Sequence, residues 1–277
     1  MRKPALLILF SLVLVIPVVT AGPGLFFIPM KYKGSDVSGG GSIKGTVTLD
    51  AIPDVPEMVI NKNAQVCEHA KVSPRFVCDK ATKGLGNVVV WIDGIKTGKK
   101  KVKGEFVIDQ KNCHYVPHIS IVPTRSTLHV KSSDPILHNV HAFKGTPDAP
   151  HSMTADVLNL AFKDNRVDPA PFDRRSLRKP GFYYLKCDNG HYWMSAYIWV
   201  VEHPYYAVTD SKGRFELKDV PAGKYTLRFW HENWNAKPVE KDGTIVSFSY
   251  GKPLTHTTSV TVTAGAPVEA NWQVPAK

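Results

Sequence analysis

Amphipathic helical periodicity is nearly absent from the sequence beyond its first thirty residues. Apolar residues do not recur at the three- and four-residue spacing of a helix that packs one face on a core, which excludes a helical bundle. Short runs rich in β-branched and aromatic residues occur instead, separated by turn signals. These runs predict an all-β protein. With 277 residues, 43% of them hydrophobic, the chain is long enough for two domains.

Acidic residues are fewer than basic ones, 24 against 35, so the formal net charge is +11. Part of the excess lies in Lys99, Lys100, Lys101 and Lys103, a run in a glycine-containing loop without interleaved aromatic residues. Such a run is typical of a solvated loop. Because no nucleic-acid-binding motif accompanies it, we expect no nucleic-acid partner.

No lipid-accepting cysteine follows the apolar N-terminal stretch. Residues 1–30 have a basic start, an apolar run and small residues at 19–21, which is the layout of an export signal. Apolar character resumes at 24–30, so a signal peptide and a membrane anchor are both open. The glycine- and serine-rich residues 31–42 predict a flexible linker. We therefore expect a periplasmic or extracellular protein, with a membrane tether through the N-terminus as the alternative.

The chain has only four cysteines, which in an exported protein would usually suggest two disulfides. If Cys187 binds a metal, three remain and one of them has no partner. Short loop closure favours Cys67 with Cys78, whereas Cys113 begins a different strand region and is the other candidate for Cys67. The residues themselves leave both pairings open.

The predicted strands are short and continue to the C-terminus. They cover residues 42–49, 87–92, 105–109, 118–122, 126–131, 182–187, 195–201, 205–210, 214–219, 224–230 and 257–263. Two turns join the later strands, with Gly213 in one and Pro221 and Gly223 in the other. The stretch 154–162 predicts either a short helical turn or a strand in a loop.

The segment KCDNGHYWMS, residues 186–195, holds three potential metal ligands close together. Cys187, His191 and Met194 offer a thiolate, an imidazole and a thioether, the soft donor set that copper uses in both oxidation states. A second imidazole is needed to complete a plane of two histidines and one cysteine, and His138 supplies it. Beside it, Asn139 is placed to hydrogen-bond across to the ligand loop and restrain it.

For two further histidines, a role other than metal binding is favoured. Strand alternation puts His141 on the same face as Asn139, where packing or a hydrogen bond to the metal ligands is favoured over metal binding. His118, five residues after Cys113, suggests a second metal site with that cysteine, but a structural role is favoured. The aromatic stretch 229–234 predicts interdomain packing rather than a binding patch.

Residues 105–203 resemble the cupredoxins. YVPHISIVPTRSTLHVKSSDPILHNV and RKPGFYYLKCDNGHYWM contain, in order, the motifs of the plastocyanin and amicyanin type. The resemblance implies a Greek-key β-sandwich with one copper ion, held by His138, Cys187 and His191 in the plane and by Met194 axially. Three residues separate Cys187 from His191 where plastocyanin and amicyanin have two. Tyr183 stands where a binuclear centre would need a second cysteine, so a single copper is expected.

Two other positions depart from the cupredoxin pattern. Arg125 occupies a turn where the family tends to have glycine, and Ser132 stands where asparagine is common. Neither residue belongs to the implied ligand set.

The flanks resemble another family. GSIKGTVTL, GLGNVVVWI and HPYYAVTDSKGRFELKDVPAGKYTLRFWHE are similar to the carboxypeptidase regulatory-like module, a transthyretin-like β-sandwich. This resemblance implies that residues 43–104 and 204–277 form one sandwich, into which the cupredoxin domain, 105–203, is inserted. The combination is similar to exported proteins of a plastocyanin-like or methylamine-utilisation-like family. Matching cysteines recur there, which favours Cys67 with Cys113.

These resemblances imply an exported mononuclear copper protein that carries single electrons and is not an enzyme. Its partner would be a redox protein such as a cytochrome or a dehydrogenase. We expect electrons to leave through His191, near the loop surface, with Tyr192 and Trp193 as docking aromatics or as a lid. One alternative is an envelope-tethered binding or copper-storage module without redox turnover. Another is an enzyme whose copper keeps an open position for small-molecule redox chemistry.

Overall fold

The computed structural model describes residues 31–163 and 168–276. Almost every regular element is a strand, which confirms the all-β expectation. The helices are short, namely α1 (Ala64–Cys67) and two 3-10 turns, η1 (Glu68–Lys71) and η2 (Ser176–Arg178). None of the helices in these two ranges is long and apolar enough to cross a membrane. The signal or anchor expected over residues 1–30 lies outside the described residues.

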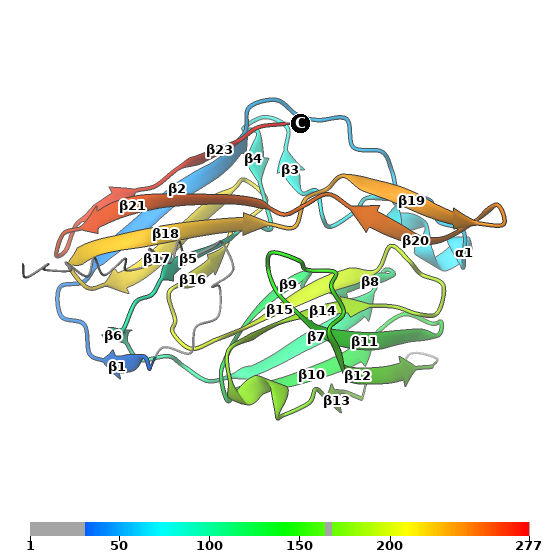
Figure 1. Ribbon diagram of the computed structural model, residues 1–277, viewed down its shortest axis with the longest axis horizontal. Coiled ribbons are helices and arrows are strands. Elements are labelled where there is room, and N and C mark those ends of the chain that lie inside the picture. Colours follow the sequence, from blue (N-terminus) through cyan, green and yellow to red (C-terminus); the bar gives the residue numbers. More distant parts are fainter. Residues whose placement is uncertain (1–30, 164–167, 277) are drawn as a thin grey trace, which may run out of the picture.

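The middle of the chain forms two facing sheets, drawn green in Figure 1. One sheet has the order β13-β10-β7-β8, with β7 (Glu105–Lys111), β8 (His114–Val116), β10 (Thr127–Ser132) and β13 (Ala170–Pro171). The other has the order β12-β11-β14-β15-β9, with β9 (Ile119–Pro123), β11 (His138–Gly145), β12 (Ala155–Phe162), β14 (Gly181–Lys186) and β15 (Ser195–Val201). Their inner faces share one buried apolar core. We call this unit the middle sandwich.

Strands from both ends of the chain form a second pair of sheets, which we call the flanking sandwich (Figure 1). One sheet has the order β16-β5-β18-β21, with β5 (Val89–Asp93), β16 (Tyr206–Val208), β18 (Gly223–His231) and β21 (Leu254–Val262). The other is built on β2 (Gly41–Leu49), with β3 (Cys78–Asp79), β4 (Gly84–Leu85), β17 (Arg214–Val220), β22 (Pro267–Glu269) and β23 (Trp272–Val274). A separate apolar core lies between them.

Strand β15 shows why the two sandwiches pack together. All seven of its residues, SAYIWVV, are buried. Side chains alternate across a strand, so Ala196 and Ile198 face the middle core while Tyr197 and Trp199 join a third apolar cluster. That cluster also holds Trp230 of β18, whose ring centroid lies 5.4 Å from that of Trp199. The continuous apolar run therefore reflects burial on both faces.

Two local outcomes differ from the sequence expectations or resolve them. Residues 155–162 form strand β12 and not a helical turn. Part of the expected flexible linker 31–42 is ordered in strands, because β1 (Lys33–Ser35) pairs with β6 (Thr97–Lys99) and β2 begins at Gly41. The hydroxyl of Tyr32 also donates to the Lys99 carbonyl oxygen (2.6 Å), which holds this segment in place.

A hairpin that we did not predict extends from the flanking sandwich. Strands β19 (Ala236–Lys241) and β20 (Thr244–Tyr250) pair only with each other among the described residues. Their turn contains Asp242 and Gly243, both with positive φ, which is the Asp-Gly signal of a type I′ turn. That dipeptide could have revealed the hairpin. In Figure 1 it lies on the same side of the molecule as α1.

Candidate metal centre

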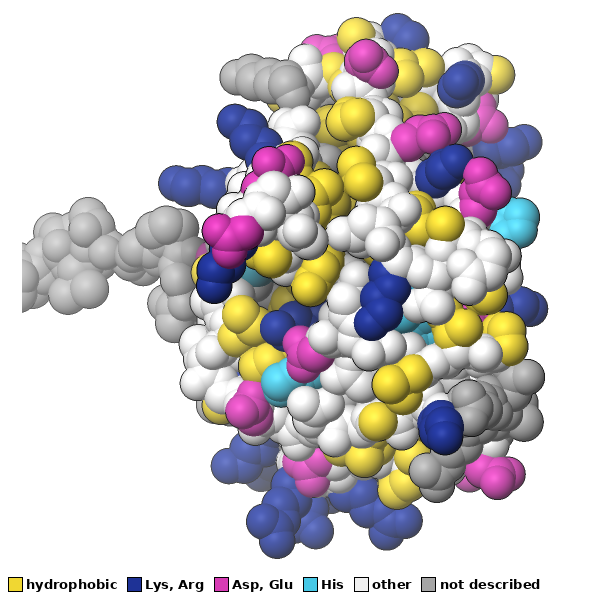
Figure 2. All heavy atoms as spheres, turned by 90° about the vertical axis from the view of Figure 1, so that its right-hand side faces the viewer, with side chains coloured by type: hydrophobic (Ala, Val, Ile, Leu, Met, Phe, Trp, Pro, Cys, Tyr) yellow, Lys and Arg dark blue, Asp and Glu magenta, His cyan; other side chains and the backbone are white. Residues whose placement is uncertain are grey.

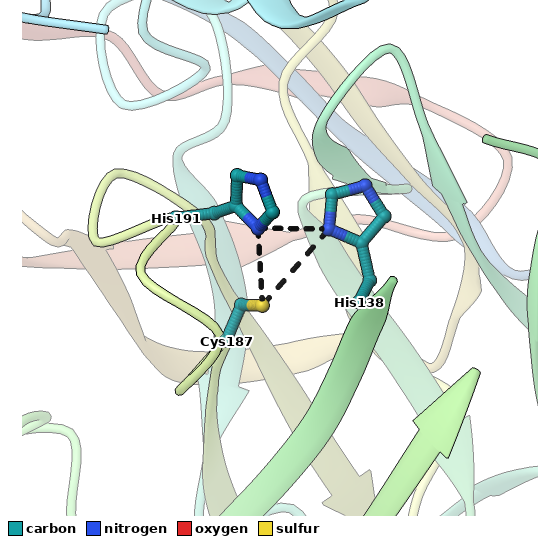
Figure 3. Close-up of side chains that lie close together, drawn as sticks. All are labelled: His138, Cys187 and His191. Atoms are coloured by element: carbon teal, nitrogen blue, oxygen red, sulfur yellow. Dashed lines mark hydrogen bonds between the residues drawn. The ribbon is translucent and has the colours of Figure 1, made fainter. Parts of the chain in front are cut away.

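Three ligand-type side chains from distant parts of the chain meet in the middle sandwich (Figure 3). His138 is the first residue of β11, Cys187 directly follows β14, and His191 lies in the loop that leads to β15. The two Nδ1 atoms are 3.2 Å apart, and the Cys187 Sγ atom lies 4.0 Å from His138 Nδ1 and 3.7 Å from His191 Nδ1. All three side chains are buried. The antiparallel pairing of β11 with β14 brings the first two together.

The chemistry and spacing of these atoms fit one soft metal ion. Nitrogen and sulfur atoms that share an ion at bond lengths of about 2.0–2.3 Å lie roughly 3–4 Å apart. A thiolate with two imidazoles, shielded from water, is the donor set of copper electron-transfer sites. Among the described residues, one further group of such side chains meets the same distance limit, made of Cys113, Asp134 and His138. Cys113 is in a disulfide and has no thiolate to offer.

Hydrogen bonds on the far side of each ring orient the two imidazoles. His138 Nε2 lies 3.0 Å from Asp134 Oδ2, and His191 Nε2 lies 3.1 Å from Asn63 Oδ1. Both partners are acceptors, so each Nε2 carries the proton and each Nδ1 presents its lone pair toward Cys187. Neither Asp134 nor Asn63 was predicted. The spacing of Asp134, four residues before His138, was the available signal, whereas Asn63 lies 128 positions from His191.

Burial and charge act differently on the two rings. Burial, together with the neighbouring His138 and Lys62, lowers the pKa of His191 to about 3, so that this ring stays neutral. Burial alone would lower the pKa of His138 as well, but the hydrogen bonds to Asp134 and Cys187 outweigh it and raise that pKa. The same bond and two backbone amides lower the pKa of Asp134 against the effect of its burial. Asp134 is thereby kept as a carboxylate that can accept the His138 proton.

Asn139 links the two strands that carry the cluster. Its Oδ1 atom accepts the backbone N–H of Asp188 (2.6 Å), and its own carbonyl accepts the Tyr115 hydroxyl (2.6 Å). His141 lies outside the cluster. Its Nδ1 atom pairs with the Asp188 carboxylate, and its Nε2 atom lies 3.0 Å from Asp156 Oδ1. Both residues thus act on the ligand loop at Asp188 and not on the three ligand atoms.

Met194 ends the ligand loop. Its side chain is fully buried in the middle core, which also contains Cys187. Its backbone N–H donates to the His191 carbonyl oxygen (3.0 Å), which closes a turn between the two residues. The loop therefore has a defined course from His191 to the start of β15.

A disulfide joins Cys67 to Cys113 in the structure, while Cys78 is a half-buried free thiol. The bond connects the segment that carries Asn63 to the middle sandwich. The Trp193 indole N–H donates to the Cys113 carbonyl oxygen (3.2 Å), so the ligand loop packs against the same bond. This arrangement places the Asn63 side chain within hydrogen-bonding distance of His191 Nε2.

His191 was expected to lie near the loop surface, and this expectation is wrong for this structure. The side chain of His191 has no exposed surface, and Trp193 is also buried. The segment around Asn63 covers the ring, and the Lys62 ammonium donates to the Asn189 carbonyl oxygen (2.7 Å) in the same loop. The sequence shows a histidine in a loop but not the remote segment that covers it.

One pocket reaches Cys187 from outside. It has a volume of about 310 Å³ and lies between the ligand loop and β20 of the hairpin. Its walls include Tyr184, Cys187, Tyr192, Phe248 and Tyr250. The hairpin of the flanking sandwich therefore forms part of the surroundings of the cluster.

His118 belongs to a separate buried network at the interface of the sandwiches. Its Nε2 atom pairs with the Glu232 carboxylate, which also pairs with the Arg75 guanidinium and accepts the Tyr197 hydroxyl (2.7 Å). The four side chains are almost completely buried. Burial alone would raise the pKa of Glu232, but Arg75 and His118 outweigh it and lower that pKa to about 2. His118 therefore belongs to this buried network, where its ring contacts Glu232 and the Ser195 carbonyl oxygen and not Cys113.

Comparison with known proteins gives limited matches. No family model and no curated protein matches the chain. Among solved structures, a copper-containing nitrite reductase from Thermus scotoductus SA-01 matches at 15% identity and a TM-score of 0.28, over 40% of this chain and 25% of its own. Reduced auracyanin from Roseiflexus castenholzii matches at 18% identity and a TM-score of 0.29, over 36% of this chain and 99% of its own. A pseudoazurin from Sinorhizobium meliloti matches at 18% identity and a TM-score of 0.25, over 36% and 75% respectively.

Proposed function

We propose that this chain is a mononuclear copper protein that carries single electrons between redox proteins. The observation that supports it is the buried triangle of one sulfur and two imidazole nitrogens at His138, Cys187 and His191. Those residues would hold the ion, and Met194 would add a weaker thioether ligand. Bound copper would supply a one-electron couple at this position.

The protein restrains the proposed ligands and excludes water from this site. Asp134 and Asn63 hold the two rings from behind, and Asn139 fixes the start of the ligand loop. Because these partners restrain the donor atoms, little rearrangement is needed when the charge at the centre changes. Burial of the ligands excludes water and keeps external ligands away from most directions. Such a rigid, dry site suits electron transfer better than substrate turnover.

The proposal includes the setting of the site. The domain that holds copper would span residues 105–203, inserted between the two parts of a regulatory-like sandwich, 43–104 and 204–277. Residues 1–30 would direct export or tether the protein, which would act in the periplasm or outside the cell. A cytochrome or a dehydrogenase would be its redox partner. Since His191 is covered, the half-buried Tyr192 beside the pocket is the better docking point.

The test is a copper titration of the full chain, followed optically and electrochemically. We expect one equivalent to bind, with a strong visible band and a reversible one-electron reduction. Binding of cuprous ion without reversible cycling would instead indicate copper storage. The pocket beside Cys187 favours small-molecule redox chemistry as a second candidate, and a spectral change on adding azide would support it. A protein that binds no copper would contradict all three functions.

Replacement of Asp134 by asparagine should weaken copper binding. Asp134→Asn removes the carboxylate that accepts the His138 ring proton, and loss of such a partner lowers metal affinity about 10–100-fold. Competition with a copper chelator at neutral pH measures the change. Asp156→Asn is the matched control, because Asp156 contacts His141 and not a ligand. Equal affinities for wild type and Asp134→Asn would show that this hydrogen bond does not support the site.

A further inference from the structure

Three arginines from two segments converge on one surface pocket away from the metal centre. Arg125 lies in the turn between β9 and β10. Arg174 and Arg178 lie in the segment before β14, where Arg178 is the last residue of η2. With Ser126 and Thr127 they line a pocket of about 540 Å³. None of the described residues that line it is acidic. We call these five residues the arginine pocket.

Among the described residues, no acidic side chain compensates the positive charge of the arginine pocket. Within residues 31–163 and 168–276, no ion pair involves any of its three guanidinium groups. The acid closest in sequence, Asp173, is engaged elsewhere. Its carboxylate accepts the backbone N–H groups of Arg175 (3.1 Å) and Ser176 (3.0 Å) and the Ser176 hydroxyl (2.8 Å). Three like charges therefore share a concave site in which the described residues supply no counter-charge.

The backbone at Arg125 supports a functional reason for this residue. Its φ is +67°, in the left-handed region where a side chain is strained and glycine is favoured. Most other non-glycine residues with positive φ are Asn or Asp, which tolerate it better. The Arg125 N–H also donates to the Leu177 carbonyl oxygen (2.7 Å), which joins the two segments. Since any residue could make that bond, the backbone alone does not call for arginine.

We propose that the arginine pocket binds a phosphate-type oxyanion. A guanidinium group presents paired N–H donors that match two oxygens of a phosphate, and its charge persists at every physiological pH. Ser126 and Thr127, whose side chains carry hydroxyl groups, line the same pocket. The anion is either a free or solute-borne phosphate or the phosphodiester of a lipid headgroup. Both offer the same oxygens to the three arginines.

The pocket is distinct from the metal centre. Arg174 and Arg178 precede Gly181, the first residue of β14. Cys187 directly follows Lys186, the last residue of that strand. At about 3.3 Å per residue this strand separates the two sites by roughly 20 Å. In Figure 2, Lys and Arg side chains gather at the lower end of the molecule, the height at which the middle sandwich lies in Figure 1. Anion binding at the arginine pocket therefore leaves the ligand loop free.

Calorimetric titration of the full chain at low salt tests the proposal with two probes. Inorganic phosphate tests the free anion, and a water-soluble short-chain phosphatidylglycerol tests the headgroup. Binding of either probe at one equivalent supports the site. The probe that binds shows whether the anion is a free phosphate or a lipid headgroup. Arg174→Gln and Arg178→Gln should each weaken binding about tenfold or more, since each removes a charge-assisted hydrogen bond. Arg175→Gln, an exposed neighbour outside the pocket, should leave it unchanged.

Arg125→Gly separates a binding role from a structural one. Glycine relieves the positive φ, so the variant should unfold at the same or a higher urea concentration than wild type. Its affinity for the bound probe should nevertheless fall about tenfold. Lower stability with unchanged affinity would overturn the proposal. The absence of binding by both probes, or binding that Arg174→Gln and Arg178→Gln leave intact, would also overturn it, whatever the outcome at the metal centre.

Discussion

Cys187→Ser is expected to abolish the intense visible absorption of the copper-loaded protein. That band arises from charge transfer between a thiolate and copper, and Cys187 is the cysteine that faces both His138 and His191. A serine hydroxyl is a harder and weaker donor for this ion. We therefore expect the colour to disappear and the copper affinity to fall steeply. Optical titration with copper under identical conditions measures both effects.

Cys78→Ser is the matched control for that experiment. Cys78 is the other free cysteine among the described residues, and it lies in β3 of the flanking sandwich. This variant should retain the full absorption and one equivalent of copper. A visible band that survives Cys187→Ser but disappears in Cys78→Ser would place the copper elsewhere and reject the proposed centre.

Arg75→Met should destabilise the fold by about 3–5 kcal/mol, the usual cost of leaving a buried charge without its partner. Arg75 and Glu232 are both almost completely buried, and the Arg75 guanidinium also donates to the Ser195 hydroxyl (2.9 Å). The substitution leaves the Glu232 carboxylate without its strongest counter-charge. Urea unfolding followed by tryptophan fluorescence gives the free energy of unfolding.

Two comparisons make this prediction specific. The double variant Arg75→Met/Glu232→Met should be more stable than Arg75→Met, because it removes the uncompensated carboxylate. Arg214→Met, which breaks an exposed pair with Asp210, should cost less than about 1 kcal/mol. If Arg75→Met costs no more than Arg214→Met, the buried network does not stabilise the interface of the sandwiches.

The pH dependence of the same network has a defined sign. The pKa of Glu232 is lowered from 4.5 to about 2 in the folded protein. Its contribution is therefore fully present above about pH 4.5 and is lost as the pH falls toward 2. The stability difference between wild type and Arg75→Met should accordingly be smaller at pH 3 than at pH 7.

Local patterns predicted much of the fold. Runs of β-branched and aromatic residues placed most of the eleven predicted strands to within two residues, as in residues 195–201, which match β15, but several other strands, β11 among them, were not predicted. They missed the β19–β20 hairpin because β19, AKPVEK, is mostly polar and exposed, so that β20 had no recognisable partner strand. They left residues 154–162 open between helix and strand because this stretch is apolar without a strict period. In the structure this stretch pairs with β11 and is therefore a strand.

For the candidate site, the sequence contained the ligand types but not their surroundings. The spacing of Cys187, His191 and Met194 within one loop and the imidazole of His138 were visible in advance. The covering of His191 by Asn63 was not, because it depends on a segment 128 positions away. The convergence of the arginines was hidden for the same reason, although Arg125 was noted as unusual.

The sequence by itself determined the all-β class, the turns and the supply of soft ligands, because alternation, turn chemistry and donor type are properties of neighbouring residues. Only the tertiary structure decided which strands pair, which cysteines are joined and which ligands are shielded from water. Those outcomes depend on how surfaces far apart in the chain pack against one another. The flanking sandwich shows this most clearly, since it brings the two ends of the chain together against the domain that carries the candidate centre.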